Sequence, residues 1–339
     1  MKRNTNNFDF LRLVFALFVI ITHSYQLIDF SQQDFLSSIT HGQLTFSHLG
    51  VCGFFTISGY LIVKSLIRSP SIAIYFKKRA LRLFPGLLVV LILTVIAGAF
   101  FTVFSLSTYF SNIKTYLYIP ANLSLYRLQD QLPGVFLSNP LAGALNGSLW
   151  TLPYEFSCYC VLVLLFFFRN DHQKLKIFTV LAVGLFFITK LFFSDMVNAF
   201  DFVLSGKYML EFGGYFTMGS LLAVFNFNKV NYKKTIALIS FLIITALIYF
   251  NQLDKFTIII IPIFIISIGL LNTPIISNVS QYFGDLSYGI YIYAFPIQQT
   301  LIYYGVQNSL MVMVYTMLIA PVFAFASWHL IEKQFLKLK

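Results

Sequence analysis

The sequence contains few charged residues. Only 10% of its 339 residues are Asp, Glu, Lys or Arg, whereas soluble domains carry about 25%. Hydrophobic residues make up 58%, and they include 40 Phe and 20 Tyr. A water-soluble domain needs a polar surface that this composition does not supply. A soluble globular protein is therefore excluded, and we expect an all-α bundle of transmembrane helices.

Cysteine is also scarce. Cys52, Cys158 and Cys160 lie in apolar runs, are odd in number and show no metal-ligand spacing. They are predicted to be buried, unreactive thiols, and no metal site is expected. The sequence also lacks internal repeats, low-complexity tracts and any separate polar domain, so residues 1–339 are predicted to form a single transmembrane domain.

Ten apolar stretches approach the ~20 residues needed to cross a bilayer. They fall at residues 8–28, 47–67, 86–106, 148–168, 177–194, 208–225, 235–251, 257–272, 286–304 and 309–330. An even number of spans places both termini on one side. Eighteen of the 23 Lys and Arg residues then share that side, and five face the other, namely Lys114, Arg127, Lys190, Lys207 and Lys255.

This asymmetry makes the side of the termini cytoplasmic. The net charge of +11 is thereby explained by topology, and no nucleic-acid partner is expected. The longest outside segment, residues 107–147, contains Pro120, Pro133 and Pro140. It is predicted to be a partly structured external loop, long enough to take part in function.

Two ionisable residues share one face of the first predicted helix. Arg12 and His23 are eleven residues apart, which returns to nearly the same face of a helix about 16 Å further along its axis. The cation lies near the cytoplasmic surface and the imidazole toward the outer half. Ionisable groups inside a membrane are costly and usually functional. A snorkelling arginine and a structural histidine remain the alternative.

Arg79 and Arg82 lie in the second predicted cytoplasmic region, within Lys77-Lys78-Arg79-Ala80-Leu81-Arg82. On a helix this i, i+3 pair shares a face and can bind one phosphate-bearing group. The same basic cluster is also typical of simple topology or of contact with lipid headgroups.

Glu155 is the most unusual acidic residue. It follows Pro153 inside the fourth predicted span, where a carboxylate is costly and a proline frees backbone groups. Trp150 and Tyr154, just before it, are also typical of an interfacial aromatic belt. Glu211, at the outer end of the sixth predicted span, is closer to the surface and carries less weight.

In this order, the motifs resemble the acyltransferase-3 family of bacterial membrane acyltransferases. The matching parts span nearly the whole chain and comprise Arg12 with His23, residues 54–61 (FFTISGYL), 79–85 (RALRLFP), 150–155 (WTLPYE) and 287–291 (SYGIY). The family's last motif often continues to a histidine, but here Ala294 precedes Phe295-Pro296. No second membrane histidine is carried over, which leaves His23 as the only candidate.

The resemblance implies a multi-pass enzyme of the bacterial inner membrane. It would transfer an acyl group, usually acetyl from acetyl-CoA, to a sugar hydroxyl of a surface molecule such as lipid-linked lipopolysaccharide O-antigen. It also implies that His23 is catalytic and that Arg12, Arg79 and Arg82 lie on the donor side. We expect Glu155 to orient the imidazole or act on the acceptor, and the further substrate-binding candidates are Ser58, Trp150, Tyr154 and Tyr291.

Physical chemistry independently fits this assignment. Guanidiniums bind the phosphates of CoA in a bidentate manner, and the slender arm of the donor can cover the ~16 Å from Arg12 to His23. The imidazole can act as a base toward the acceptor hydroxyl or accept the acyl group itself, and the spacing leaves both open. A proton-coupled transporter or flippase that uses Arg12, His23 and Glu155 is the alternative, although no internal repeat supports it.

Overall fold

The structure, a computed structural model, describes residues 6–201 and 203–339, and over these residues it is helical without β-strands. The longer helices are α1 Phe8–Gln26, α3 Phe46–Ile67, α4 Ile72–Phe101, α7 Leu152–Leu162, α8 His172–Phe192, α10 Gly206–Val224, α11 Lys233–Tyr249, α12 Leu253–Gly269, α14 Ser287–Tyr303 and α15 Ser309–Ser327. Shorter helices are α2 Phe35–Ile39, α5 Leu106–Ser111, α6 Ile113–Leu123, α9 Ser194–Asn198, α13 Val279–Phe283 and α16 Lys333–Leu336.

Each of the ten predicted spans coincides with a helix. Six helical segments are long and apolar enough to cross a membrane, and they begin at Phe8, Phe46, Ile72, Leu149, His172 and Ser309. Of the other four, α11, α12 and α14 have 17 residues each, whereas α10 has 19 and is as long as α1. The chain is thus a multi-pass helical membrane protein, whereas the number ten and the cytoplasmic termini remain predictions. Lys2 and Arg3, which entered the charge count, lie outside the described residues.

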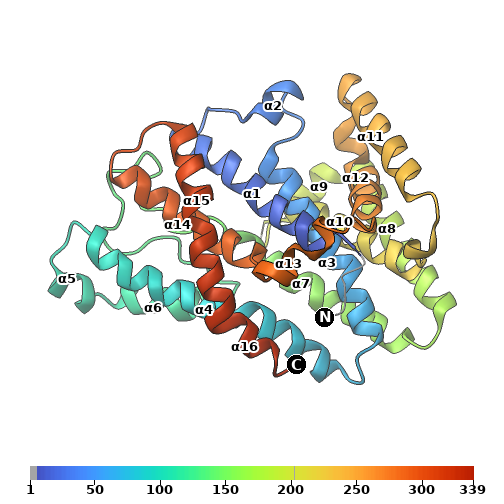
Figure 1. Ribbon diagram of the computed structural model, residues 1–339, viewed down its shortest axis with the longest axis horizontal. Coiled ribbons are helices and arrows are strands. Elements are labelled where there is room, and N and C mark those ends of the chain that lie inside the picture. Colours follow the sequence, from blue (N-terminus) through green and yellow to red (C-terminus); the bar gives the residue numbers. More distant parts are fainter. Residues whose placement is uncertain (1–5, 202) are drawn as a thin grey trace.

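Helix α3 forms the centre of the bundle, with α1 on one side and α10 on the other (Figure 1). The contact between α3 and α10 is made backbone to backbone. A Cβ at Gly59 would lie 1.9 Å from the Phe216 carbonyl oxygen, and one at Gly219 would lie 2.1 Å from the Thr56 oxygen. Small residues allow such close helix packing in membranes, so these glycines set the position of α3.

Helices α14 and α15 pack together beside α1, whereas α8, α11 and α12 lie on the opposite side of the bundle (Figure 1). Buried Gln298 joins α14 to α1, because its Nε2 donates to the Ile20 carbonyl (3.0 Å) and to Ser24 Oγ (2.7 Å). Buried side-chain amides of this kind hold membrane helices in register.

Residues 107–147 fold back onto the bundle. They include all of α6 and all of α5 except its first residue. Asn139 donates to the carbonyl and side-chain oxygens of Gln299 in α14, both at 2.9 Å. Gln299 in turn donates to the carbonyls of Leu141 and Ala144. The segment is partly structured, as predicted, and it is anchored along much of its length.

The expectation that all three cysteines are buried is wrong for one of them. Cys52 and Cys158 are buried, but Cys160 is exposed. Cys158 and Cys160 are two residues apart on α7, and two helical positions diverge by about 200° around the axis. Cys160 therefore faces outward while Cys158 faces the core.

Candidate functional site

Two cavities of about 340 Å³ each lie in the bundle, and Val51 and Tyr291 line both of them. The inner cavity lies next to α16 and is lined by residues that include Arg12, Arg79, Arg82, Glu155, Asp285 and Lys339. The outer cavity lies next to the start of α3 and is lined by residues that include His23, His48, Trp150, Lys207, Tyr208 and Glu211. Both volumes lie in the range of small-molecule sites.

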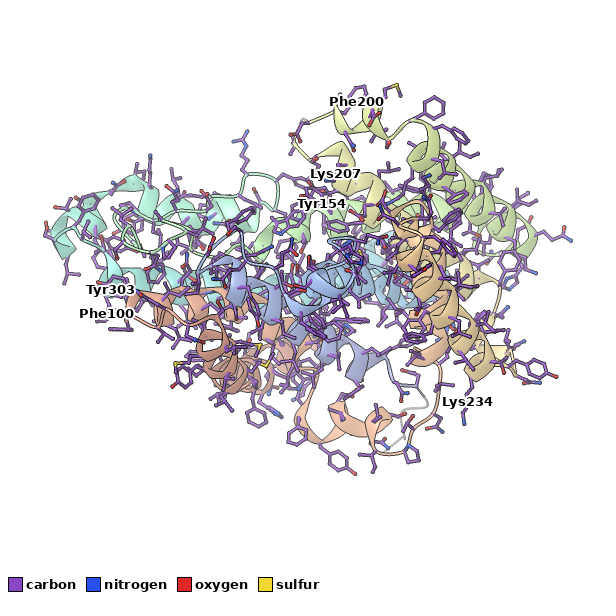
Figure 2. The ribbon with its side chains drawn as sticks, turned by 90° about the horizontal axis from the view of Figure 1, so that it is seen from above. Phe100, Tyr154, Phe200, Lys207, Lys234 and Tyr303 are labelled. Atoms are coloured by element: carbon purple, nitrogen blue, oxygen red, sulfur yellow. The ribbon has the colours of Figure 1, made fainter. Side chains whose placement is uncertain are left out.

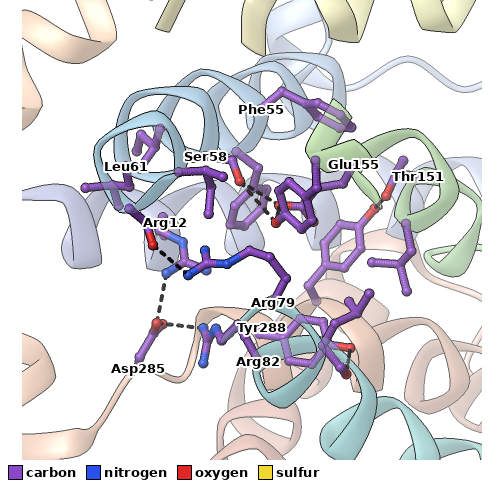
Figure 3. A pocket seen from close by; sticks show the side chains of 18 of the residues that line it. Arg12, Phe55, Ser58, Leu61, Arg79, Arg82, Thr151, Glu155, Asp285 and Tyr288 are labelled. Atoms are coloured by element: carbon purple, nitrogen blue, oxygen red, sulfur yellow. Dashed lines mark hydrogen bonds and ion pairs between the residues drawn. The ribbon is translucent and has the colours of Figure 1, made fainter. Parts of the chain in front are cut away.

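Asp285 organises the arginines of the inner cavity. Its Oδ2 accepts from Arg12 Nη1 at 2.8 Å and from Arg82 Nη2 at 2.6 Å (Figure 3). Burial raises the pKa of this carboxyl, but the two guanidiniums outweigh burial and hold the pKa below its usual range. The charged carboxylate thereby connects α1 to α4 just before α14 begins.

A π-helical turn, η5 Trp328–Glu332, supplies two of the side chains that surround Arg82. It follows α15 directly and brings buried Glu332 within 3.3 Å of Arg82 Nη1. The Arg82 guanidinium also lies 5.6 Å from the Trp328 ring and 5.7 Å from the Tyr288 ring. Such π-turns often occur at functional sites, and here the turn places an acidic and an aromatic side chain around one arginine.

Arg79 is less constrained. Within the described part of the chain no carboxylate lies at ion-pair distance from it, and its Nη2 makes only a long contact of 3.4 Å with Ser65 Oγ. Its Nε is buried without a hydrogen-bond partner. A buried polar atom without a partner requires an explanation, and an anionic ligand in the inner cavity supplies one.

Glu155 lies in the inner cavity rather than beside His23. It accepts hydrogen bonds from Ser58 Oγ at 2.7 Å and from the Tyr159 hydroxyl at 2.5 Å (Figure 3). The structure therefore gives no contact by which this carboxylate orients the imidazole, and it places Glu155 and Ser58 among the arginines. The sequence analysis had assigned Glu155 to the acceptor side or to His23.

His23 lines the outer cavity from α1. Its ring makes an edge contact with Phe295 at a centroid distance of 5.5 Å, and no described residue hydrogen-bonds its imidazole. Tyr291, which separates the two cavities, exchanges a 2.6 Å hydrogen bond with Thr151. Arg12 and His23 thus lie on one helix but line different cavities, Arg12 the inner one and His23 the outer one, and Tyr291 lines both.

Trp150 lines the outer cavity, but Tyr154 lines neither cavity. The Trp150 ring packs 4.6 Å from Tyr208 and 5.8 Å from Tyr154. Tyr154 is buried, and its hydroxyl accepts a hydrogen bond from the Ser205 backbone amide. Figure 2 shows Tyr154 and Lys207 near each other in the upper middle of the view. Tyr154 therefore supports the aromatic wall of the outer cavity from behind.

The sequence analysis overlooked a second imidazole. His48, near the start of α3, lines the outer cavity with His23, and its Nε2 lies 2.7 Å from Glu211 Oε1. His48 is therefore a second candidate histidine, beside His23. A carboxylate within an apolar stretch was the available signal, but Glu211 was discounted because of its distance from the centre of the membrane.

Three potential metal ligands also meet here. The ligand atoms of His48, Cys52 and Glu211 lie within 4.8 Å of one another. His48 and Cys52 are one turn apart on α3, and Glu211 comes from α10. The cysteine pattern did not reveal the group, because its members come from two helices and only one is a cysteine.

Comparison with known proteins identifies the relatives of the chain. A family model described as an acyltransferase domain matches residues 5–331. The "O-acetyl transferase" of Shigella phage Sf6 is 31% identical over 98% of this chain and 96% of its own length. "Nodulation protein 10" of Rhizobium leguminosarum bv. viciae is 30% identical over 98% of this chain and 94% of its own length. No solved structure matches the chain significantly.

Proposed function

This chain belongs to the acyltransferase-3 family, and we propose that it transfers an acetyl group from cytoplasmic acetyl-CoA to a sugar hydroxyl of a surface polysaccharide. It is an O-acetyltransferase, and the proposed setting is the bacterial inner membrane, with a lipid-linked polysaccharide such as O-antigen as acceptor. The observation that carries the proposal is an arginine-lined cavity that meets a histidine-lined cavity at Val51 and Tyr291.

The inner cavity suits the donor. Acetyl-CoA carries its negative charge on phosphates at one end, and Arg79, Arg82 and Lys339 line this cavity. Arg79 is the first phosphate ligand in this proposal, because no carboxylate among the described residues pairs with it. Arg82 is already fixed by Asp285 and Glu332, so it acts as a preorganised second contact.

His23 suits the transfer step. As a base, its imidazole takes the proton of the acceptor hydroxyl while that oxygen attacks the thioester carbonyl carbon. The carbon–sulfur bond then breaks, and the protonated His23 gives its proton to the departing sulfur, so that CoA leaves as the thiol. In the relay alternative, the imidazole nitrogen attacks the thioester carbonyl first, and the carbon–sulfur bond breaks to release the CoA thiolate. The acceptor hydroxyl then attacks the acetyl-imidazole, the carbon–nitrogen bond breaks, and the hydroxyl proton passes to the freed imidazole. The absence of a hydrogen-bond partner for His23 among the described residues is compatible with both routes.

One argument for a polysaccharide acceptor is not supported by the structure. The sequence analysis favoured it because residues 107–147 offered outward contact area, but none of these residues lines either cavity. The aromatic and polar lining of the outer cavity supports a sugar acceptor instead. The transporter alternative is not supported, since the family model that matches the chain describes an acyltransferase domain.

Mass spectrometry of surface glycans tests the proposal. Cells that produce the chain should carry acetylated sugars with an added mass of one acetyl group, and cells that produce the His23→Ala variant at equal membrane abundance should not. Purified protein should also consume labelled acetyl-CoA. Unchanged glycans together with no consumption of acetyl-CoA would contradict the proposal.

A further inference from the structure

The outer cavity differs from the inner one in its charge. Its charged lining consists of Lys207 with Glu211 and Asp254, and Asp254 is also paired with Lys190 at 3.0 Å. Positive and negative groups are therefore close to balanced here, whereas arginines dominate the inner cavity. A strongly anionic ligand is favoured by the inner cavity and gains little from the outer one.

The outer cavity also has an aromatic wall beside its polar groups. Trp150 and Tyr208 pack edge to face at 4.6 Å, and both line the cavity. A pyranose ring presents an apolar face of C–H groups and an edge of hydroxyls. Aromatic rings pack against the C–H face, and a few fixed polar groups hydrogen-bond the hydroxyls.

Glu211 is held in place by His48. The 2.7 Å contact uses Oε1 of the carboxylate, and the two side chains are only 14% and 27% exposed. No described residue hydrogen-bonds Oε2. An ionised carboxylate oxygen is a strong acceptor, so this oxygen is available for a ligand hydroxyl.

We propose that the outer cavity binds a neutral, hydroxyl-rich sugar, with the Glu211 carboxylate accepting hydrogen bonds from its hydroxyls against the Trp150–Tyr208 wall. His48 is a positioning residue, since it acts through Glu211. This inference rests on the proposed function and names the acceptor class of the same enzyme. The proposed sugar site needs neither a metal ion nor Cys52, because the contact with His48 is enough to hold Glu211 in place.

The chain carries its own reporters for a binding test. It has two tryptophans, of which Trp150 lines the outer cavity and Trp328 the inner one. Full-length protein in nanodiscs with Trp328→Phe reports on the outer cavity by Trp150 fluorescence. The reciprocal Trp150→Phe protein reports on the inner cavity. The probes are the methyl pyranosides of glucose, galactose and rhamnose, methyl glucuronide as the charged comparison, and acetyl-CoA.

At least one neutral pyranoside should change Trp150 fluorescence with a saturating titration. Glu211→Gln should raise the midpoint about ten-fold or more, as expected for the loss of a charge-assisted hydrogen bond. His48→Ala should act similarly, and His48→Gln should retain part of the affinity because its amide still donates to the carboxylate. His41→Asn is the matched control, since His41 is exposed and lines neither cavity, and it should bind as the parent does.

Acetyl-CoA should titrate Trp328 in all of these variants within about two-fold of the parent, which also shows that they are folded. The inference is overturned if no neutral pyranoside perturbs Trp150, if Glu211→Gln leaves the midpoint unchanged, or if methyl glucuronide binds more tightly than the neutral sugars. A stoichiometric divalent metal in the purified protein that is lost in His48→Ala would also overturn it. Failure of acetyl-CoA to titrate Trp328 would instead count against the donor site of the proposed function.

Discussion

His23 is the residue on which the chemistry depends. It lines the outer cavity, and its ring makes an edge contact with Phe295 but no hydrogen bond with any described residue. Little of the packing should therefore change when its ring is removed. Its assigned role as base or acyl carrier, in contrast, has no substitute on α1.

We therefore predict that His23→Ala inserts and folds normally but transfers acetyl at a rate lower by about 10²–10⁴, the usual contribution of a positioned proton-transfer group. The measurement is transfer of labelled acetyl by equal amounts of membrane-inserted protein. Activity within a few-fold of the parent would show that His23 is neither base nor relay.

Arg79 and Arg82 should behave differently on substitution. Arg79→Ala removes a guanidinium without a carboxylate partner, so the protein should stay folded while KM for acetyl-CoA rises about ten- to a hundred-fold, the effect of one lost charge-assisted contact. Because a phosphate contact holds the ground and transition states alike, kcat should change little. Arg79→Lys should rescue only in part, since the planar fork is lost.

Arg82→Ala should instead destabilise the protein. It leaves Glu332, which is 2% exposed, without its ionic partner, and a buried carboxylate without a partner costs on the order of 3 kcal/mol. Thermal unfolding in detergent measures this difference. Equal melting temperatures for the Arg79→Ala and Arg82→Ala variants would contradict the structural role that Arg82 has in addition to its proposed donor contact.

At the scale of single residues, the sequence identifies the ionisable side chains that are costly to place in a membrane, but not the residues that pair with them. Arg12, Arg79 and Arg82 were predicted to share one site, and the inner cavity does contain all three. Asp285, which joins Arg12 to Arg82, was missed because it lies in a loop about 200 residues from Arg82 and has no periodic pattern. A link formed only when distant helices pack leaves no local signal.

At the scale of elements, the close approach of α3 and α10 positions both cavities. Gly59 follows Ser58, which lines the inner cavity, and Gly219 lies on the same helix as Glu211 of the outer cavity. A shift between the two helices would therefore alter both sites at once.

We predict that Gly59→Ala and Gly219→Ala each destabilise the protein by about 1–3 kcal/mol, the usual cost of overpacking. Their Cβ atoms would lie about 2 Å from a carbonyl oxygen of the facing helix. Gly184→Ala in α8 is the matched control, because nothing lies within 4 Å of its Cβ, and alanine there should be neutral or slightly stabilising. Melting temperatures in detergent compare the three, and an equal response from all three would contradict the packing argument.

Helix positions were largely predictable because hydrophobic length is a local signal. All ten predicted ranges contain helices, although α11, α12 and α14 have only 17 residues each. The return of residues 107–147 onto α14 was not predictable. It depends on side-chain hydrogen bonds such as that between Asn139 and Gln299, which connect segments 160 residues apart.

At the scale of the whole molecule, the two cavities define a direction. The inner cavity contains the arginines and Lys339 of the C-terminus, and the outer cavity contains Lys207, one of the few basic residues assigned to the outside. Donor phosphates cross a hydrocarbon core only at great cost. We therefore expect only the acetyl-bearing arm to pass from one cavity toward the other.

Sealed membrane vesicles of known orientation test this direction most directly. Labelled acetyl-CoA is supplied outside either inside-out vesicles, which expose the cytoplasmic face, or right-side-out vesicles, and His23→Ala vesicles serve as the control. Label should enter the acceptor only when the cytoplasmic face meets the donor, and it should be absent with His23→Ala. Equal labelling of the acceptor in intact vesicles of both orientations would contradict transfer from an inner donor site to an outer acceptor site.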